Sequence, residues 1–168
     1  LLQPKIEAEI AFTLSAEIST EITAEDAPRY VEEVVAAFEI VDSRVANWDI
    51  SLADTIADNA SSGLYVLGER IDRSDAPDLT TVTMAATADG ETVSQGVGAD
   101  CLGSPWNALA WLANTALASG SPLRAGDVVL SGALGPMVPV TPGSSFTATI
   151  SGVGSVTASF SDSTVSGR

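Results

Sequence analysis

Short stretches of the chain place apolar residues at every second position, and others place them at helical spacing. The clearest alternation spans residues 6–14. Its apolar positions are Ile6, Ala8, Ile10, Phe12 and Leu14. The intervening positions are Glu7, Glu9, Ala11 and Thr13. Because successive side chains of a strand point to opposite faces, this pattern predicts a strand with one buried face.

Helical spacing follows further along the chain. Tyr30, Val34, Val35 and Phe38 recur at three- and four-residue intervals behind the capping pattern of Thr23 and Asp26, which predicts a helix over 24–37. We expect a short buried strand over 39–42, a short helix over 49–58 and a helix from Pro105 to Leu117. The other expected strands are 63–67, 79–87, 92–98, 128–130, 146–150 and 155–160, with a tight turn at Asp89-Gly90.

Runs of strands with a few helices, without regular β-α-β alternation, predict a mixed and largely antiparallel α+β fold. The chain shows no internal repeat and no linker that would divide it. We therefore expect one domain over residues 1–160, followed by a polar tail over 161–168. Because Leu1 stands where a native start would have Met, we expect the chain to begin inside a longer polypeptide.

Charge and composition exclude several classes of partner. The 168 residues include 22 acidic and 7 basic side chains, a net charge of -15, which argues against binding to nucleic acid or to anionic membranes. The sequence has no apolar run of the roughly 18 residues that a membrane span requires. The single Cys101 cannot form an internal disulfide, so we expect a cytoplasmic protein.

The chain contains no histidine. This excludes Ser-His-Asp and Cys-His catalysis and any His-ligated zinc site within the chain. A metal held here needs oxygen ligands, which favours magnesium, calcium or manganese.

Three glutamates are candidate ligands. Glu7 and Glu9 project from one face of the first predicted strand, and Glu39 lies beside apolar residues where a buried carboxylate needs a partner. The alternatives are an exposed acidic strand face for Glu7 and Glu9, and an ion pair with Arg44 for Glu39.

Two sequence blocks carry a resemblance to a known family. PKIEAEIAF and FEIVDSRVANWDISLADTIADNASSG resemble the signatures of the 2-keto-4-pentenoate hydratase and 4-oxalocrotonate decarboxylase family, part of the fumarylacetoacetate hydrolase-like superfamily. Later segments also resemble this family, namely LGSPWNALAWLAN, PLRAGDVVLSG and GVGSVTASF. The resemblance covers nearly the whole chain and implies a β-roll of the fumarylacetoacetate hydrolase C-terminal type.

The resemblance implies that Glu7, Glu9 and Glu39 ligate Mg²⁺ or Mn²⁺. It implies action on a small 2-oxo acid, either hydration of 2-hydroxypenta-2,4-dienoate to 4-hydroxy-2-oxopentanoate or decarboxylation of the 4-oxalocrotonate type. Ser61 and Asn59 in ADNASSG become candidate substrate-contacting residues, with ordinary turn chemistry as the alternative. It also implies a homo-oligomer, which associates in some relatives with another enzyme of the same pathway.

Two departures from the family stand out. Relatives carry a lysine in a preceding KxG-like segment that this sequence does not match, and Lys5 is too close to the glutamates in sequence to replace it. Where relatives have a Thr-Gly-Ser-like loop, this chain has Ser131, Gly132 and Ala133. A non-catalytic scaffold subunit and another reaction of the superfamily therefore stay open as alternatives.

Overall fold

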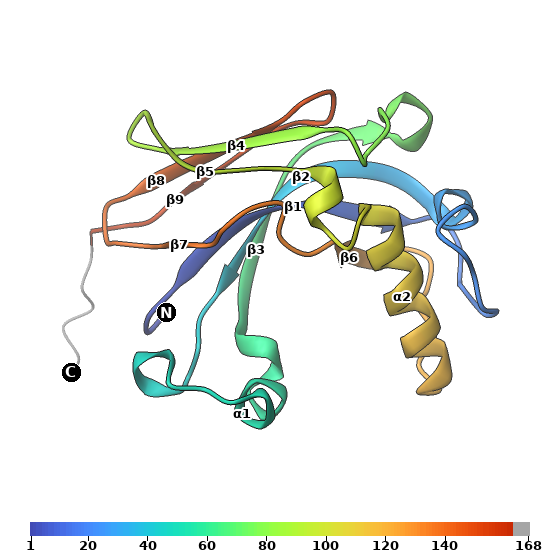
Figure 1. Ribbon diagram of the computed structural model, residues 1–168, viewed down its shortest axis with the longest axis horizontal. Helices are drawn as coiled ribbons and strands as arrows, with labels where there is room; N and C mark the ends of the chain where they lie inside the picture. Colours follow the sequence, from blue (N-terminus) through green and yellow to red (C-terminus); the bar gives the residue numbers. More distant parts are fainter. Residues whose placement is uncertain (163–168) are drawn as a thin grey trace.

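The computed structural model describes residues 1–162 and contains two antiparallel sheets (Figure 1). The strands of the first sheet are β1 (Lys5–Leu14), β2 (Val31–Val41), β3 (Ser62–Asp72), β6 (Val128–Leu130) and β7 (Val138–Pro139). Those of the second are β4 (Thr83–Ala88), β5 (Glu91–Val97), β8 (Ser145–Ile150) and β9 (Gly154–Ser159). The α-helices are α1 (Leu52–Ala57) and α2 (Pro105–Ala118). Short 3₁₀ turns span Ala27–Tyr30, Ala46–Trp48, Asn59–Ser61, Arg73–Asp75 and Gly98–Asp100.

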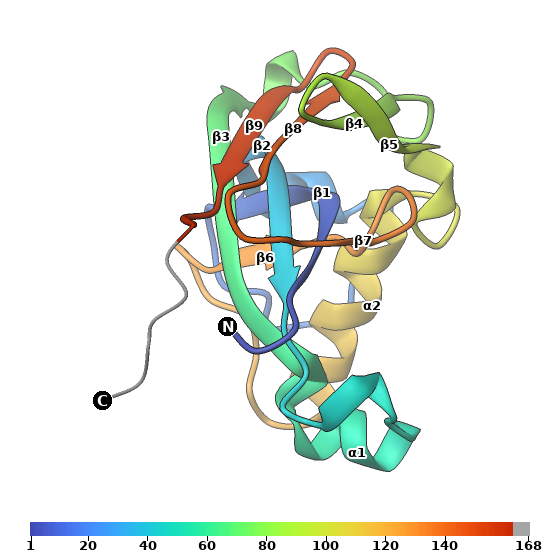
Figure 2. The ribbon, with the colours of Figure 1, turned by 90° about the vertical axis from the view of Figure 1, so that its left-hand side faces the viewer.

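The strand order of the first sheet is β3-β2-β1-β6, and β7 pairs with the start of β1. The second sheet has the order β5-β4-β8-β9 and lies across one face of the first, with β9 against β2 and β3 (Figures 1 and 2). Gly68 permits this close approach, because a Cβ atom there would lie 2.3 Å from the carbonyl oxygen of Ser155. The observed architecture confirms the expected largely antiparallel α+β fold.

The hydrophobic core fills the space between the two sheets. The first sheet supplies the predicted apolar face of β1 and alternate residues of β2, and the second sheet supplies the inner faces of β4, β8 and β9. These core residues include Ile6, Ile10, Phe12, Val34, Phe38, Met84, Phe146, Ala148, Ile150 and Val156. Side chains on the other face of β1 and β2 are therefore directed away from the second sheet, and they include Glu7 and Glu9 on β1 and Glu39 on β2.

The predicted helix over 24–37 is wrong. Thr23 and Asp26 exchange hydrogen bonds in a local turn, a 3₁₀ turn follows, and β2 then runs from Val31 to Val41. Residues 34–37 are fully buried on both faces, since β2 lies between β1 and β3. A strand buried on both faces carries a continuous apolar run. Some residues of such a run fall at three- and four-residue intervals by chance, which imitates the pattern of a helix.

The expectation of a single buried face on β1 is also wrong. Glu9 and Ala11, on the face opposite the core, are each only 1% exposed. Ala11, Val35 and Ala37 form a second small apolar cluster there, covered by Leu67, Val128 and Leu130. The expected strand over 39–42 is the end of β2, and the expected strand over 63–67 is the first part of the longer β3.

The remaining elements follow the sequence more closely. The helix expected over 49–58 is present as α1, α2 begins at Pro105 as predicted, and β6 occupies residues 128–130. Both hairpins form, although β4 begins at Thr83 rather than Leu79. Asp89 and Gly90 have φ angles of 52° and 89°, as their tight turn requires. Residues 163–168 of the predicted tail lie outside the described residues.

Helix α2 packs against β1 through an aromatic pair. The rings of Trp106 and Phe12 are stacked with their centroids 4.7 Å apart. Trp111, one turn further along α2, is 63% exposed, so the two tryptophans of the helix have different environments. Within residues 1–162, neither α-helix has the length and apolar character needed to cross a bilayer.

We predict that Phe12→Ala lowers the free energy of unfolding by about 3–5 kcal/mol, because it removes a fully buried ring and its stacking partner's contact. Chemical denaturation followed by circular dichroism measures the change. Leu52→Ala is the control, since Leu52 is 78% exposed. Equal losses in the two variants would contradict the assigned core.

Candidate metal centre

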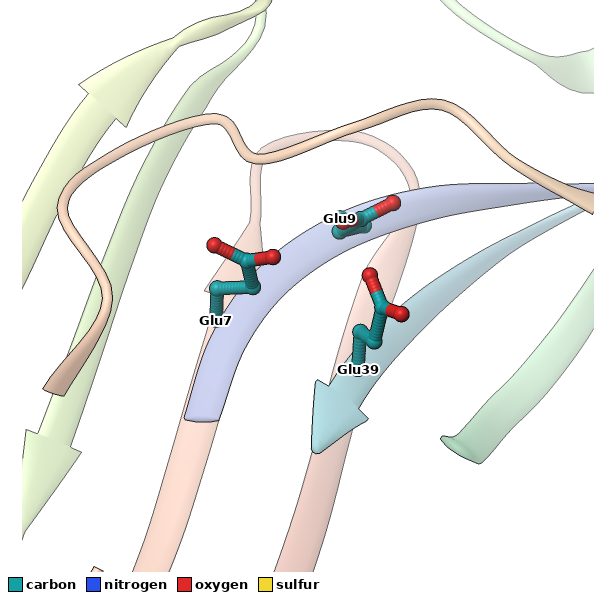
Figure 3. Close-up of side chains that lie close together, drawn as sticks. All are labelled: Glu7, Glu9 and Glu39. Atoms are coloured by element: carbon teal, nitrogen blue, oxygen red, sulfur yellow. The ribbon is translucent and has the colours of Figure 1, made fainter. Parts of the chain in front are cut away.

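The pairing of β1 with β2 brings the three predicted glutamates together. Glu7 lies directly opposite Glu39, and Glu9 lies opposite Ala37, which places its side chain diagonally from Glu39. One carboxylate oxygen of each residue lies within 4.8 Å of the others. Figure 3 shows the three carboxylates converging above the two strands. Like charges on opposing strands destabilise a sheet, so this arrangement calls for protons or a cation.

Burial strengthens the repulsion among the three carboxylates. Glu9 is 1% exposed, whereas Glu7 and Glu39 are partly buried. Desolvation, followed by the charge of Glu39, raises the pKa of Glu7 from 4.5 to about 7. The same two causes raise the pKa of Glu9 to about 9. In the folded chain without a cation, both carboxyl groups therefore keep their protons to a higher pH than ordinary glutamates do.

The loop that follows β6 fixes Glu9. The backbone N–H of Gly132 donates a hydrogen bond to Glu9 Oε2 over 2.7 Å, which opposes the rise in the pKa of Glu9. The Ser131 hydroxyl accepts a hydrogen bond from the N–H of Ile10, and the Ser131 carbonyl accepts one from the Cys101 thiol. Gly132 has a φ angle of 98°, a conformation that favours glycine. The loop thus binds one oxygen of the Glu9 carboxylate, and the carboxylate still faces Glu7 and Glu39.

The segment between β2 and β3 is held by charges other than the three glutamates. Arg44 forms an ion pair with Asp58 over 2.6 Å rather than with Glu39, so the Arg44–Glu39 alternative is wrong. Asp42 accepts hydrogen bonds from the backbone N–H groups of Leu2 and Gln3. These contacts fold residues 42–61 over one end of β1 and β2.

Ser61 and Asn59 occupy a strained turn in this segment. Asn59, Ala60 and Ser61 all have positive φ angles between 52° and 55°, which non-glycine residues adopt rarely. The Ser61 hydroxyl donates to Asp58 Oδ2 over 3.2 Å, and Ser61 lines a hollow beside Glu7 and Glu39. The Asn59 side chain is exposed and donates to Ser62 Oγ. The structure thus brings Ser61 close to the glutamates, whereas the Asn59 amide is engaged within its own turn.

Two hollows flank the glutamates and share Glu39. The first, of about 370 Å³, adjoins Glu9 and is walled mainly by apolar side chains of α2 and its neighbours. These wall residues are Leu102, Ala108, Trp111, Leu112 and Leu130. The second, of about 380 Å³, adjoins Glu7 and contains Lys5, Trp48, Thr55 and Ser61. Hollows of this volume fit small ligands.

The sequence did not reveal two features of this site. The Gly132 N–H was missed because a backbone donor leaves no side-chain signal, although a Ser-Gly pair after a short strand marks a turn. Lys5 was set aside for its closeness to Glu7 in sequence. Since residues 5, 7 and 9 share one face of a strand, that closeness is what places Lys5 beside the glutamates.

The fold and the site together define the class of protein: a two-sheet antiparallel domain in which three carboxylates converge on one sheet face and offer oxygen ligands to a cation. A family model, "Fumarylacetoacetate (FAA) hydrolase C-terminal", matches residues 2–161. The chain belongs to this family, and the resemblance found in the sequence blocks is confirmed.

Several enzymes are similar to the chain. The TodF product hydratase of Pseudomonas putida is 55% identical over 161 residues, covering 95% of this chain and 60% of the relative. The 2-keto-4-pentenoate hydratase of Paraburkholderia xenovorans is 51% identical over 168 residues, covering 99% and 62%. The chain therefore spans about three fifths of the length of these relatives.

A solved structure of 4-oxalocrotonate decarboxylase from Pseudomonas putida G7, complexed with magnesium and adipate, has a TM-score of 0.90 and 34% identity. The match covers 95% of this chain and 61% of the decarboxylase. The same enzyme complexed with calcium and acetate gives a TM-score of 0.88 at 33% identity, again covering 95% and 61%.

We predict that, with metal removed by a chelator, the stability of the chain falls as pH rises from about 5 to 9. The pKa of Glu7 and Glu9 is higher in the folded chain than the 4.5 of the unfolded chain, so the folded state retains protons that the unfolded state releases. Their contribution is complete below pH 4.5 and is lost as pH rises through about 7 and 9. Thermal melts across this range measure the slope.

Glu9→Gln removes the most strongly shifted group and should flatten this slope, because the amide does not titrate. Asp75→Asn serves as the control, since Asp75 is exposed on a distant turn. A slope that is the same in wild type and Glu9→Gln would contradict the buried-carboxyl interpretation.

Proposed function

We propose that this chain forms the metal-holding part of a hydro-lyase for small 2-oxo or 2-hydroxy-dienoate acids. The favoured reaction is hydration of 2-hydroxypenta-2,4-dienoate to 4-hydroxy-2-oxopentanoate in aromatic catabolism. The observation that carries the proposal is the cross-strand register that sets Glu39 against Glu7, with the buried Glu9 beside them. Relatives named as hydratases support the choice of reaction.

The three glutamates suit a divalent ion on chemical grounds. All the donors are carboxylate oxygens, which Mg²⁺ and Mn²⁺ prefer, and the donor atoms lie within 4.8 Å of one another. A divalent cation removes the mutual repulsion that otherwise raises the pKa of Glu7 and Glu9. When bound, such an ion supplies Lewis acidity to the oxygen atoms of a 2-oxo acid.

Other residues of the chain are proposed to orient the glutamate ligands and the substrate. The Gly132 N–H keeps Glu9 turned toward Glu39, which fixes the donor set before any ligand arrives. Ser61 lines the hollow beside Glu7 and is proposed to hydrogen-bond the substrate, which requires release of its hydroxyl from Asp58. Asn59 is proposed to support the same turn, and a direct role for it requires release of its bond to Ser62.

A decarboxylase of the 4-oxalocrotonate type is the second candidate. The observation in its favour is the 0.90 TM-score to that enzyme at 34% identity. A third candidate, a non-catalytic scaffold subunit, predicts the same metal centre without turnover.

We further propose a single metal-binding domain over residues 1–160, a homo-oligomer, association with another enzyme of the same pathway, and a cytoplasmic location. Exposed apolar side chains on β3, at the edge of the first sheet, offer a contact surface for a second copy; they are Leu64 and Tyr65, 58% and 55% exposed. The buried single Cys101 is compatible with a reducing compartment.

We predict that calorimetric titration of Mg²⁺ or Mn²⁺ into the purified chain gives one binding site per chain. Oxalate, a mimic of the enolate of a 2-oxo acid, should tighten metal binding, since it adds oxygen ligands to the same ion. Glu39→Gln should weaken metal binding at least about 10-fold, a typical cost of disturbing a ligand set.

Glu33→Gln is the matched control, because Glu33 lies on the same strand but pairs with Arg70 away from the centre. Loss of metal binding in both variants, or in neither, would contradict the assigned ligands. Assays with 2-hydroxypenta-2,4-dienoate and with 4-oxalocrotonate then separate hydratase from decarboxylase. Metal binding without turnover of either substrate favours the scaffold alternative.

A further inference from the structure

The two hollows beside the glutamates differ in charge. The hollow next to Glu9 is lined by Trp111, Leu112 and Leu130 together with Ser131 and Gly132, and has no cationic side chain in its lining. The hollow next to Glu7 is also largely apolar, with Val41, Ile50 and Met137 in its lining, but it includes Lys5, the single lysine of the chain, together with Thr55 and Ser61. A ligand that spans the centre therefore meets a cation at one end and none at the other.

Lys5 is held in its hollow by an aromatic ring. Its ammonium nitrogen lies 4.1 Å from the ring centroid of Trp48, within the range of a cation–π interaction. The Trp48 ring is itself fixed, because its indole N–H donates to the carbonyl of Gln3 over 3.0 Å. Asn47 and Trp48 have φ angles of 58° and 56°, so the chain adopts a strained turn to place this ring.

The Lys5 charge has no ion-pair partner among residues 1–162. The ion pairs in this part of the chain are Arg29–Asp26, Arg44–Asp58 and Arg70–Glu33. Lys5 is partly buried and shares its hollow with Glu7 and Glu39 without a direct ion pair to either, so its charge is available for a charge-assisted hydrogen bond to an anionic ligand.

We propose that Lys5 forms the carboxylate subsite of this centre and that the hollow beside Trp111 receives the uncharged tail of the substrate. This inference rests on the proposed function and extends it by fixing the direction in which the acid lies. The carboxylate of a 2-oxo acid lies toward Lys5 and Ser61, and its carbon chain passes the glutamates toward Trp111. The substrate class is therefore a monocarboxylic acid with an apolar tail, rather than a dicarboxylic acid.

Binding measurements on the Mn²⁺-loaded chain test this direction. The probes are pyruvate, 2-oxopentanoate, which adds two methylene groups, and 2-oxoglutarate, which adds a second carboxylate. In the wild type, 2-oxopentanoate should bind about fivefold more tightly than pyruvate, because its added carbons leave water. The second carboxylate of 2-oxoglutarate lacks a cation in the apolar hollow, so this acid should bind more weakly than 2-oxopentanoate.

Two variants should separate the two ends of the ligand. Lys5→Met should weaken pyruvate and 2-oxopentanoate alike, by about tenfold or more, while Mn²⁺ binding is retained or tightened by loss of the nearby positive charge. Trp111→Ala should weaken 2-oxopentanoate several-fold and leave pyruvate within about twofold, because pyruvate has no tail to reach that wall.

Arg73→Met is the matched control for net charge. Arg73 is exposed and follows β3, eight positions beyond Tyr65, the cross-strand partner of Glu39. If Arg73→Met weakens pyruvate as much as Lys5→Met does, Lys5 acts only through the overall field and the subsite is refuted.

Other results also test the Lys5 subsite and the direction of the substrate tail. Unchanged pyruvate affinity in Lys5→Met, together with normal Mn²⁺ binding, overturns the Lys5 subsite but not the proposed function. Tighter binding of 2-oxoglutarate than of 2-oxopentanoate overturns the assigned tail direction. Failure of the wild-type chain to bind Mn²⁺ overturns the proposed function and this inference with it.

Discussion

Repulsion among three carboxylates is the constraint around which this part of the molecule is organised. The register of β1 and β2 sets Glu7 directly opposite Glu39, and like charges at such positions destabilise a sheet. Burial of Glu9 removes the water that would otherwise screen it. A sheet that retains such a group gains stability from a cation or from protons, so the same geometry underlies both the predicted loss of stability of the metal-free chain at high pH and the proposed site for a divalent ion.

The surrounding elements serve to keep that geometry rigid. The apolar face of β1 packs between the two sheets, and the opposite face carries Glu7 and Glu9 beside the small apolar cluster around Ala11. The loop after β6 brings the Gly132 N–H to Glu9, and residues 42–61 fold over the other end of the centre through the Arg44–Asp58 ion pair. The Gly132–Glu9 hydrogen bond joins segments far apart in sequence, whereas the Arg44–Asp58 ion pair closes the segment between β2 and β3 on itself.

The difference in charge between the two hollows connects the proposed metal site with the proposed direction of the substrate. The first hollow has no cationic side chain in its lining and the second has Lys5, so the two ends of a small acid would meet different charges. Strained turns at Asn47–Trp48 and Asn59–Ser61 border the cationic hollow, and such conformations persist only where surrounding contacts enforce them. The proposed hydratase activity and the proposed direction of the substrate therefore depend on the same short segment between β2 and β3.

The sequence by itself predicted the positions of β1, α2 and the two hairpins and singled out three candidate glutamates, because strict alternation, a proline at a helix start and an Asp-Gly turn are local signals. It could not determine β2, since a central strand buried on both faces has no alternation, and Val34 and Val35 fit a helix equally well. Only the tertiary structure decided that Glu39 faces Glu7, that Arg44 pairs with Asp58, and that Lys5 shares a hollow with Ser61. These contacts join different strands or opposite ends of a loop, and their partners are chosen by packing and register, which no local pattern encodes.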